Sequence, residues 1–189
     1  MKNIEIEVRG ALTKNEYNDL LSFMGKNAKN KEADNRITTF FMIPDKTLKV
    51  AHKLDQRKCK IALKLGDIVS SSHQTEYEID IKPEQFNLTV ELFKHLGFTE
   101  TQETRQDRIN FTLNGYEFAV KWSKDLGYHF EAETVVDESA DINAERSKLE
   151  HFVTDELGLK LLSEEEFAEI CSRVDAAYKE SAQKMTTCF

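Results

Sequence analysis

Hydrophobic and polar residues alternate strictly at the start of the chain, over residues 3–9. Ile4, Ile6 and Val8 occupy alternate positions, and each is followed by a charged residue, Glu5, Glu7 or Arg9. Because the side chains of a strand point to its two faces in turn, this pattern predicts a β-strand with one apolar face. Similar patterns predict seven further strands, over residues 36–42, 47–53, 59–65, 75–81, 104–113, 116–122 and 128–135.

Helices are predicted where residues that favour a helix N-terminus precede apolar residues with helical spacing. Thr13 and Ser163 each stand three residues before a glutamate, which is the spacing of a capping box. Pro83 suits the first turn of a helix, and Gly97 suits the position after its end. The four predicted helices cover about 13–27, 83–97, 140–157 and 164–181.

The order of these elements predicts an antiparallel β-fold. Asn114-Gly115 lies between two predicted strands and is a strong signal for a two-residue hairpin turn. Eight strands with few strong helices favour an α+β fold built on a closed or nearly closed eight-stranded antiparallel β-barrel. We expect one domain over residues 1–189, with the barrel at about 1–136 and C-terminal helices at about 138–182.

Composition narrows the class of protein. The chain has 189 residues, of which 40% are hydrophobic and 32% charged, with a net charge of −8. An acidic protein is a poor general binder of nucleic acid, because phosphate contacts need positive charge. No apolar run is long enough for a membrane span, and the start does not resemble a secretory signal. Three scattered cysteines favour a reducing cytoplasm.

One face of nearly every predicted strand is charged, and the signs are segregated. Lysines dominate the third and fourth strands, whereas carboxylates dominate the first, fifth and eighth; only the strand at 36–42 lacks charge on this face. For a single strand, the simplest explanation is a solvated face of an ordinary sheet. Agreement among seven strands favours instead a charged interior, because Glu and Lys are poor strand formers.

A barrel with helices over its apolar exterior would turn these faces into a charged tunnel. Carboxylates on one side would suit a hard divalent cation, which prefers oxygen ligands. Amines and guanidinium groups on the other side would bind phosphate oxygens. Since buried charges are costly unless they are neutralised, we expect a metal and a highly charged phosphate in this tunnel.

Several motifs resemble one known family in their order along the chain. Glu5-Ile6-Glu7-Val8-Arg9 resembles the E-x-E-x-K/R strand of the CYTH superfamily, the triphosphate tunnel metalloenzymes. Segments that resemble its later motifs are Thr47-Leu48-Lys49-Val50, Ile61-Ala62-Leu63-Lys64, Glu76-Tyr77-Glu78-Ile79, Leu96-Gly97-Phe98 and Phe130-Glu131-Ala132-Glu133. The resemblance covers about residues 3–135. It implies an eight-stranded barrel that binds triphosphate with Mg²⁺ or Mn²⁺ in its tunnel.

The resemblance also implies roles for single residues. The implied metal ligands are Glu5, Glu7, Glu131 and Glu133, and the implied catalytic acids are Glu5, Glu7 and Glu78. The implied phosphate-binding residues are Arg9, Lys49, Lys64 and Arg108, with Lys53, Lys60, Arg105 and Lys121 as further basic partners.

Three positions depart from the family pattern. Thr38-Thr39 stands where the family has an acid, and Ala51 stands where it has a second arginine. Lys121 replaces a carboxylate that precedes the closing strand. The loss of that acid weighs against turnover more than against phosphate binding.

Three functions fit the sequence. The first is metal-dependent hydrolysis of inorganic tripolyphosphate or of an organic or nucleoside triphosphate. The second is a class IV-type adenylyl cyclase, and the third is a non-catalytic binder of polyphosphate, nucleotide or RNA 5′ ends. The expected partner is a small-molecule triphosphate, with nucleic acid only as an RNA 5′-triphosphate end, no membrane, and a monomer or homodimer.

Overall fold

The computed structural model describes residues 3–43, 46–65 and 75–186. The strands are β1 (Asn3–Leu12), β2 (Lys29–Ala33), β3 (Arg36–Ile43), β4 (Lys46–Lys53), β5 (Lys58–Leu65), β6 (Thr75–Ile81), β7 (Thr101–Leu113), β8 (Tyr116–Ser123) and β9 (Gly127–Asp137). The helices are α1 (Lys14–Asn27), α2 (Phe86–His95), α3 (Ile142–His151) and α4 (Glu164–Thr186). A 3₁₀ turn (Pro83–Gln85) precedes α2, and a π-helical turn (Phe152–Glu156) follows α3.

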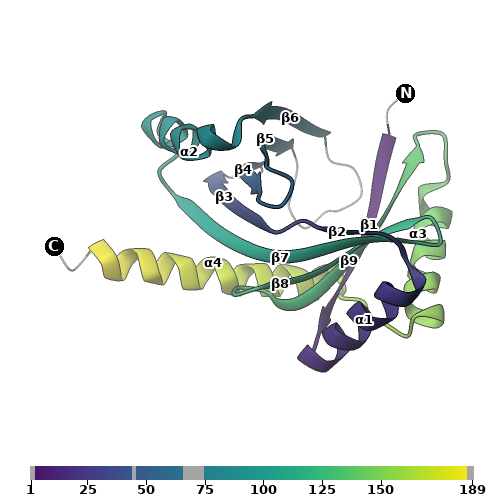
Figure 1. The fold of residues 1–189 in the computed structure, drawn as a ribbon. Coiled ribbons are helices and arrows are strands. Elements are labelled where there is room, and N and C mark those ends of the chain that lie inside the picture. Colours follow the sequence, from purple (N-terminus) through teal and green to yellow (C-terminus); the bar gives the residue numbers. More distant parts are fainter. Residues whose placement is uncertain (1–2, 44–45, 66–74, 187–189) are drawn as a thin grey trace.

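The strands form one antiparallel sheet in the order β1-β9-β8-β7-β3-β4-β5-β6, and β2 pairs with β7 beside β3. Figure 1 shows that this sheet is curled, and we refer to its concave face as the inner face. Among the described residues, β1 and β6 do not pair, so the sheet is an open half-barrel. The α+β class and the eight predicted strands are confirmed. β2 was not predicted because all five of its residues are exposed and its sequence does not alternate.

The predicted start and turn signals have the expected geometry. The Thr13 and Ser163 side chains accept hydrogen bonds from the backbone N–H of Glu16 and Glu166, and both glutamates bond back to the capping residue. Asn114 and Gly115 both have positive φ, as a type I′ hairpin turn requires. The third helix starts later than predicted, because Asp141 caps its first turn.

Two apolar cores lie on the outer face of the curled sheet. In the larger core, side chains such as Phe118 and Phe130 on β8 and β9 pack against α1, α3 and the turn that follows α3. In the smaller core, Phe41 and Val50 on β3 and β4 pack against Phe86 and its neighbours on α2. Full burial of one such side chain stabilises the fold by about 1.5–3 kcal/mol. Because these cores take the outward-facing side chains, the charged faces of the strands line the inner face.

Hydrogen bonds hold the C-terminal helix to the sheet just before its first residue and again farther along it. The Leu162 N–H donates to the Arg9 carbonyl at 2.9 Å, just before α4 begins. Farther along α4, the Tyr178 hydroxyl donates to the Glu103 carbonyl at 2.6 Å and lies 3.1 Å from an Asp125 carboxylate oxygen. As Figure 1 shows, α4 therefore runs beside β7 and β8.

Among the described residues, no helix is long and apolar enough to cross a membrane. Cys59 and Cys171 are both free thiols, and Cys188 lies outside the described residues.

Candidate functional site

Three carboxylates meet at one side of the inner face. Glu5 and Glu7 come from β1, and Glu133 stands directly opposite Glu7 on β9. Each offers one carboxylate oxygen, and these three oxygens lie within 4.8 Å of one another. Oxygen ligands from several carboxylates at this spacing fit a hard divalent cation such as Mg²⁺ or Mn²⁺. We refer to Glu5, Glu7 and Glu133 as the acidic cluster.

The electrostatics of the acidic cluster favour a cation. Burial, followed by the negative charge of Glu131, raises the pKa of Glu7 to about 7. Burial and the neighbouring Glu5 also raise the pKa of Glu133. Glu7 and Glu133 hold their protons to higher pH because their charges are poorly solvated and are repelled by neighbouring carboxylates, and a bound cation would offset both effects. The donor set therefore fits a divalent metal ion on chemical grounds.

A buried carboxylate organises a second group of charged side chains. Asp34, which is 0% exposed, lies between β2 and β3. Its Oδ2 accepts hydrogen bonds from Arg36 Nε and Asn110 Nδ2, both at 3.0 Å. The Lys53 Nζ and Arg108 Nε atoms lie 3.8 Å and 3.7 Å from the same oxygen. Burial alone would raise the pKa of Asp34, but the bond from Arg36 and the surrounding charges hold it below its usual value.

Arg36, Lys53 and Arg108 thus converge on a single carboxylate, and we refer to them as the basic cluster. Three cations around one buried anion leave a local excess of positive charge. Burial, and then the adjacent Arg36 guanidinium, lower the pKa of Lys53. The three side chains are 14–24% exposed, so they can still be reached from the hollow of the sheet. This arrangement fits an anion with several oxygens, such as a phosphate chain.

Lys121 and Glu131 separate the two clusters. Lys121 is 3% exposed and forms an ion pair with Glu131, and Arg108 lies 3.7 Å from the same carboxylate. Burial lowers the pKa of Lys121. Burial would raise the pKa of Glu131, but Lys121 and Arg108 outweigh this and hold it well below its usual range. Glu131, expected to bind metal, is therefore neutralised within the protein and lies outside the acidic cluster.

His129 lies beside this pair. Its Nδ1 is 3.0 Å from the Gly127 carbonyl, so Nδ1–H donates to that oxygen when the ring is neutral. The other ring nitrogen is buried and has no hydrogen-bond partner among the described residues. Burial, followed by the charge of Lys121, lowers the pKa of His129 to about 4. The ring is consequently neutral at neutral pH.

Five other predicted residues also lie on the inner face. Arg9 lies on the inner face, where its guanidinium bonds Glu7 and stacks 4.1 Å above the Phe167 ring of α4. Lys60 forms an ion pair with Glu78, so Glu78 is not part of the acidic cluster. By register, Lys49 and Lys64 face inward on β4 and β5, in line with Lys53 and Lys60.

Arg105 is not brought to the site. It stands opposite Ile37 of β3, on the face of β7 that turns away from Arg108. Alternate residues of a strand point to opposite sides, and Arg105 and Arg108 differ by an odd number of positions.

Asp34 and Arg36 were missed in the sequence. The only charged residue in the strand at 36–42 is its first, Arg36, so the pattern of alternation does not indicate a charged face. Asp34 precedes the strand and belongs to no alternating run. The signal that could have indicated them is the sequence Asp34-Asn35-Arg36, an acid, an amide and a base directly before a strand.

The fold is shared with several solved structures of low sequence identity. A protein of Pyrococcus horikoshii matches with a TM-score of 0.68 and 19% identity, over 89% of this chain and 98% of that chain. A candidate adenylate cyclase of Vibrio parahaemolyticus matches with a TM-score of 0.64 and 14% identity, over 91% and 99% of the two chains.

A third structure carries a stated activity. It is a candidate adenylyl cyclase of Hippeastrum, described as having a dominant triphosphatase activity, with a TM-score of 0.60 and 17% identity. The match covers 85% of this chain and 90% of that chain. At these identities the three likenesses show the fold alone.

A search of the curated proteins found no match to the chain. The model of the CYTH domain, in contrast, matches residues 3–168, which is most of the sequence and includes every strand and the start of α4. It covers both the acidic cluster and the basic cluster. The chain belongs to the CYTH family.

Proposed function

We propose that this protein hydrolyses a triphosphate in a metal-dependent reaction on the inner face of its curled sheet. The observation that carries the proposal is the segregation of charge on that face. Three carboxylates with oxygens within 4.8 Å of one another lie on β1 and β9, and three cations converge around Asp34 on β3, β4 and β7. A triphosphate with a divalent cation has the matching distribution of charge.

The chain's own residues would hold the substrate in place. The guanidinium groups of Arg36 and Arg108 suit paired hydrogen bonds to phosphate oxygens, and Lys53 adds a point charge. These groups are already oriented by Asp34, so they would stabilise charge that develops on the phosphates without further rearrangement. A cation bound at the acidic cluster would supply further neutralisation of the phosphate oxygens. Such a cation would displace the proton that Glu7 holds near neutral pH.

The comparisons support this choice among the functions that the sequence leaves open. Members of the CYTH family act on triphosphates, and the Hippeastrum relative is described by its triphosphatase activity. Phosphate release should therefore be tested with tripolyphosphate, thiamine triphosphate and ATP, each with Mg²⁺ or Mn²⁺. We expect orthophosphate from at least one substrate and none after removal of the metal. Folded protein that releases phosphate from none of them contradicts the proposal.

Variants of the acidic cluster test where the metal acts. Glu5→Gln and Glu7→Gln should each lower kcat by about 100-fold or more, because each removes a charged oxygen ligand. The matched control is Asp107→Asn, which removes an exposed acid from the outer side of β7. Full activity in both cluster variants, with the control equally active, would place the metal elsewhere.

One observation favours a second candidate, a protein that binds triphosphate without hydrolysing it. Lys121 occupies the position of a family carboxylate and neutralises Glu131, so the inner face has fewer free acids than the family pattern implies. Metal-dependent binding of tripolyphosphate with no turnover would single out this candidate. Pyrophosphate and a cyclic nucleotide as products from ATP would indicate a cyclase instead.

A further inference from the structure

A fourth carboxylate lies beside the acidic cluster. Glu131 is two residues from Glu133 on β9, so it faces the same side of the strand. It is close enough to Glu7 for its negative charge to act on that carboxylate. Its oxygens are nevertheless not among those that lie within 4.8 Å of one another. Glu131 has a partner of its own on the neighbouring strand.

Lys121 of β8 supplies that partner. Its ammonium group forms an ion pair with Glu131, and its side chain is only 4% exposed. Lys121 stands opposite His129, two residues from Glu131, and therefore faces the same side of the sheet. A cation this deeply buried would be costly without a counter-charge. The pair thus places a permanent positive charge beside the acidic cluster.

The charges on this side of the inner face match one divalent cation. The acidic cluster and Glu131 together carry four negative charges when all are ionised. Arg9 bonds Glu7 at 2.8 Å, and Lys121 pairs with Glu131, so each of these cations offsets one negative charge. Two negative charges remain, which is the number that one Mg²⁺ or Mn²⁺ ion neutralises.

Two neighbouring charged groups leave this balance unchanged. Arg108 lies 3.7 Å from Glu131, but it lies equally close to Asp34 and belongs to the basic cluster. Glu117 of β8 is exposed to water and accepts a hydrogen bond from the Thr112 hydroxyl at 2.8 Å. Water and salt screen an exposed charge far more than a buried one.

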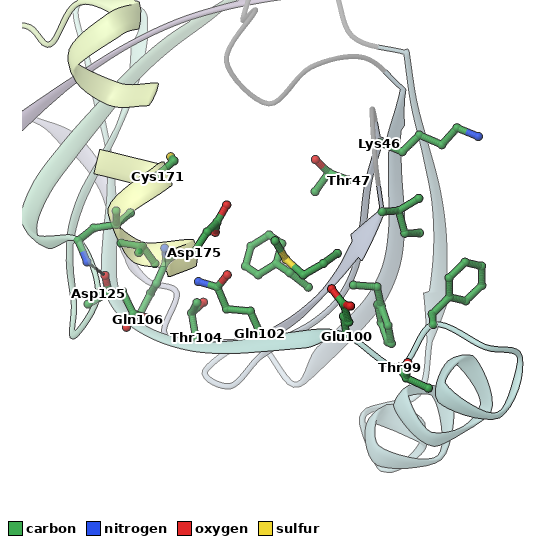
Figure 2. Close-up of a pocket in the computed structure, with 18 of the residues that line it drawn as sticks. Lys46, Thr47, Thr99, Glu100, Gln102, Thr104, Gln106, Asp125, Cys171 and Asp175 are labelled. Atoms are coloured by element: carbon green, nitrogen blue, oxygen red, sulfur yellow. Dashed lines mark hydrogen bonds between the residues drawn. The ribbon is translucent and has the colours of Figure 1, made fainter. Parts of the chain in front are cut away.

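A second group of ligands is not found elsewhere in the described part of the chain. A cavity of about 830 Å³ lies between α4 and strands β3, β4 and β7, and its described lining includes Glu100, Asp125 and Asp175. Figure 2 shows Glu100 and Asp125 on opposite sides of this cavity, so these acids do not converge. Among the described residues, only the acidic cluster brings three possible ligand atoms within 4.8 Å of one another. A second cation would therefore need Glu131.

We propose that Lys121 occupies the place of a second cation beside the acidic cluster, and that the protein consequently binds one divalent ion per chain. The inference rests on the proposed function, because it takes the acidic cluster as the metal site, but it requires no turnover. Lys121 is then a positioning residue. By pairing with Glu131, it leaves Glu5, Glu7 and Glu133 as the ligands.

Titration with Mn²⁺ alone, in which electron paramagnetic resonance measures the free ion, counts the ions that each variant binds. The wild-type protein should bind one per chain. Lys121→Asp removes the ammonium group and adds a carboxylate, so four negative charges remain and a second ion should bind. Lys124→Asp is the matched control, because it makes the same change at an exposed lysine just after β8. This control should bind one ion.

A double variant serves as the test if Lys121→Asp does not fold. Lys121→Met with Glu131→Gln removes both charges of the pair, and neutral replacements of a buried ion pair are often tolerated. The charge balance is unchanged, so one Mn²⁺ should bind with an affinity within about threefold of wild type, whereas Glu133→Gln should lower the affinity about tenfold or more.

The inference is overturned if the wild-type protein binds two or more ions with comparable affinity. It is also overturned if folded Lys121→Asp binds only one ion, if Lys124→Asp gains the same second ion, or if the double variant loses as much affinity as Glu133→Gln. In each case the wild-type protein still binds manganese, so the proposed function stands. A wild-type protein that binds no Mn²⁺ contradicts the metal site, and with it both the inference and the proposed function.

Discussion

Asp34 shows how a single buried acid can organise a binding surface. It has no exposed surface, yet four polar side chains gather around one of its oxygens. Three of them are cations that would otherwise repel one another in a partly buried space. Asp34 thus fixes the position of the basic cluster while it neutralises only part of its charge, and the remaining charge is available to a ligand.

Replacing this acid should be costly. Asp34→Asn leaves the three cations without a counter-charge, so the free energy of unfolding should fall by about 3–5 kcal/mol. Urea unfolding at neutral pH measures this loss. Asp107→Asn removes an exposed acid and should change the free energy by less than about 0.5 kcal/mol. Equal stability of the two variants would show that Asp34 does not organise the cluster.

His129 should make the protein sensitive to mild acid. Its pKa is about 4 in the folded protein, whereas in the unfolded chain a histidine titrates near 6.5. The unfolded state therefore binds more protons between these values, and stability falls as the pH drops from about 6.5 to about 4. The full loss is about 3 kcal/mol.

A His129→Asn variant isolates this effect, measured by urea unfolding as a function of pH. Glu7 acts in the opposite direction, because its raised pKa makes stability fall as the pH rises from about 4.5 towards 7. Glu7 is present in both proteins, so its contribution cancels in the difference. A difference between wild type and variant that stays constant from pH 7 to pH 4.5 would contradict the assignment of a neutral, buried His129.

At the scale of elements, the attachment of α4 depends on a close approach at Gly10. A Cβ atom at this position would lie well inside van der Waals contact with the Lys160 carbonyl oxygen and the Phe130 ring. The backbone of the segment before α4 thus passes directly over β1, where Leu162 bonds Arg9. Only glycine leaves room for both strand pairing and this crossing.

Gly10→Ala should therefore loosen α4 and cost about 2 kcal/mol or more of stability. Hydrogen exchange in α4 should accelerate more than exchange in β8, which lies within the sheet. Gly25→Ala is the matched control: nothing lies within 4 Å of the added carbon, and alanine favours the helix by up to about 1 kcal/mol. A Gly10→Ala protein as stable as the Gly25→Ala protein would contradict the crossing.

The strands could be predicted from the sequence because burial of one face imposes alternation directly on each segment. The eight alternating runs all became strands, and their inward faces carry the charges expected of them. β2 could not be predicted, since it is exposed throughout and is held only by pairing with β7. The role of Asp34 could not be predicted for a related reason. It depends on Lys53 and Arg108, which are distant in the sequence and approach Asp34 only in the folded sheet.

The sequence also could not predict which charged side chains of the site pair with one another. Glu131 follows the alternation of the acidic strand and looks identical to Glu133 in the sequence. Their environments differ because Lys121, on the neighbouring β8, reaches Glu131. Arg105 was expected to be a further basic partner, but it lies an odd number of positions from Arg108 and therefore on the other face of β7.

At the scale of the whole molecule, the curled sheet brings two opposite charge distributions to face the same hollow. β1 and β9 contribute the acidic cluster, and β3, β4 and β7 contribute the basic cluster. Lys121 and Glu131 form an ion pair between the two clusters. The folded protein should consequently be stabilised by a metal–triphosphate complex, which satisfies both clusters.

Thermal unfolding measures this stabilisation. Tripolyphosphate with Mg²⁺ should raise the Tm by more than the sum of the shifts caused by each alone, because a ligand that binds only the folded state shifts the equilibrium towards it. The Glu7→Gln variant should lose the extra shift and keep the shift caused by tripolyphosphate alone. Additive shifts in the wild-type protein would show that the two clusters do not share one ligand.

The most direct measurement is a crystal structure with tripolyphosphate and Mn²⁺, in which anomalous scattering locates the metal. The account predicts a manganese peak among the carboxylate oxygens of Glu5, Glu7 and Glu133, and phosphates in contact with Arg36, Lys53 and Arg108. Manganese bound elsewhere, or a triphosphate outside the hollow of the sheet, would contradict it.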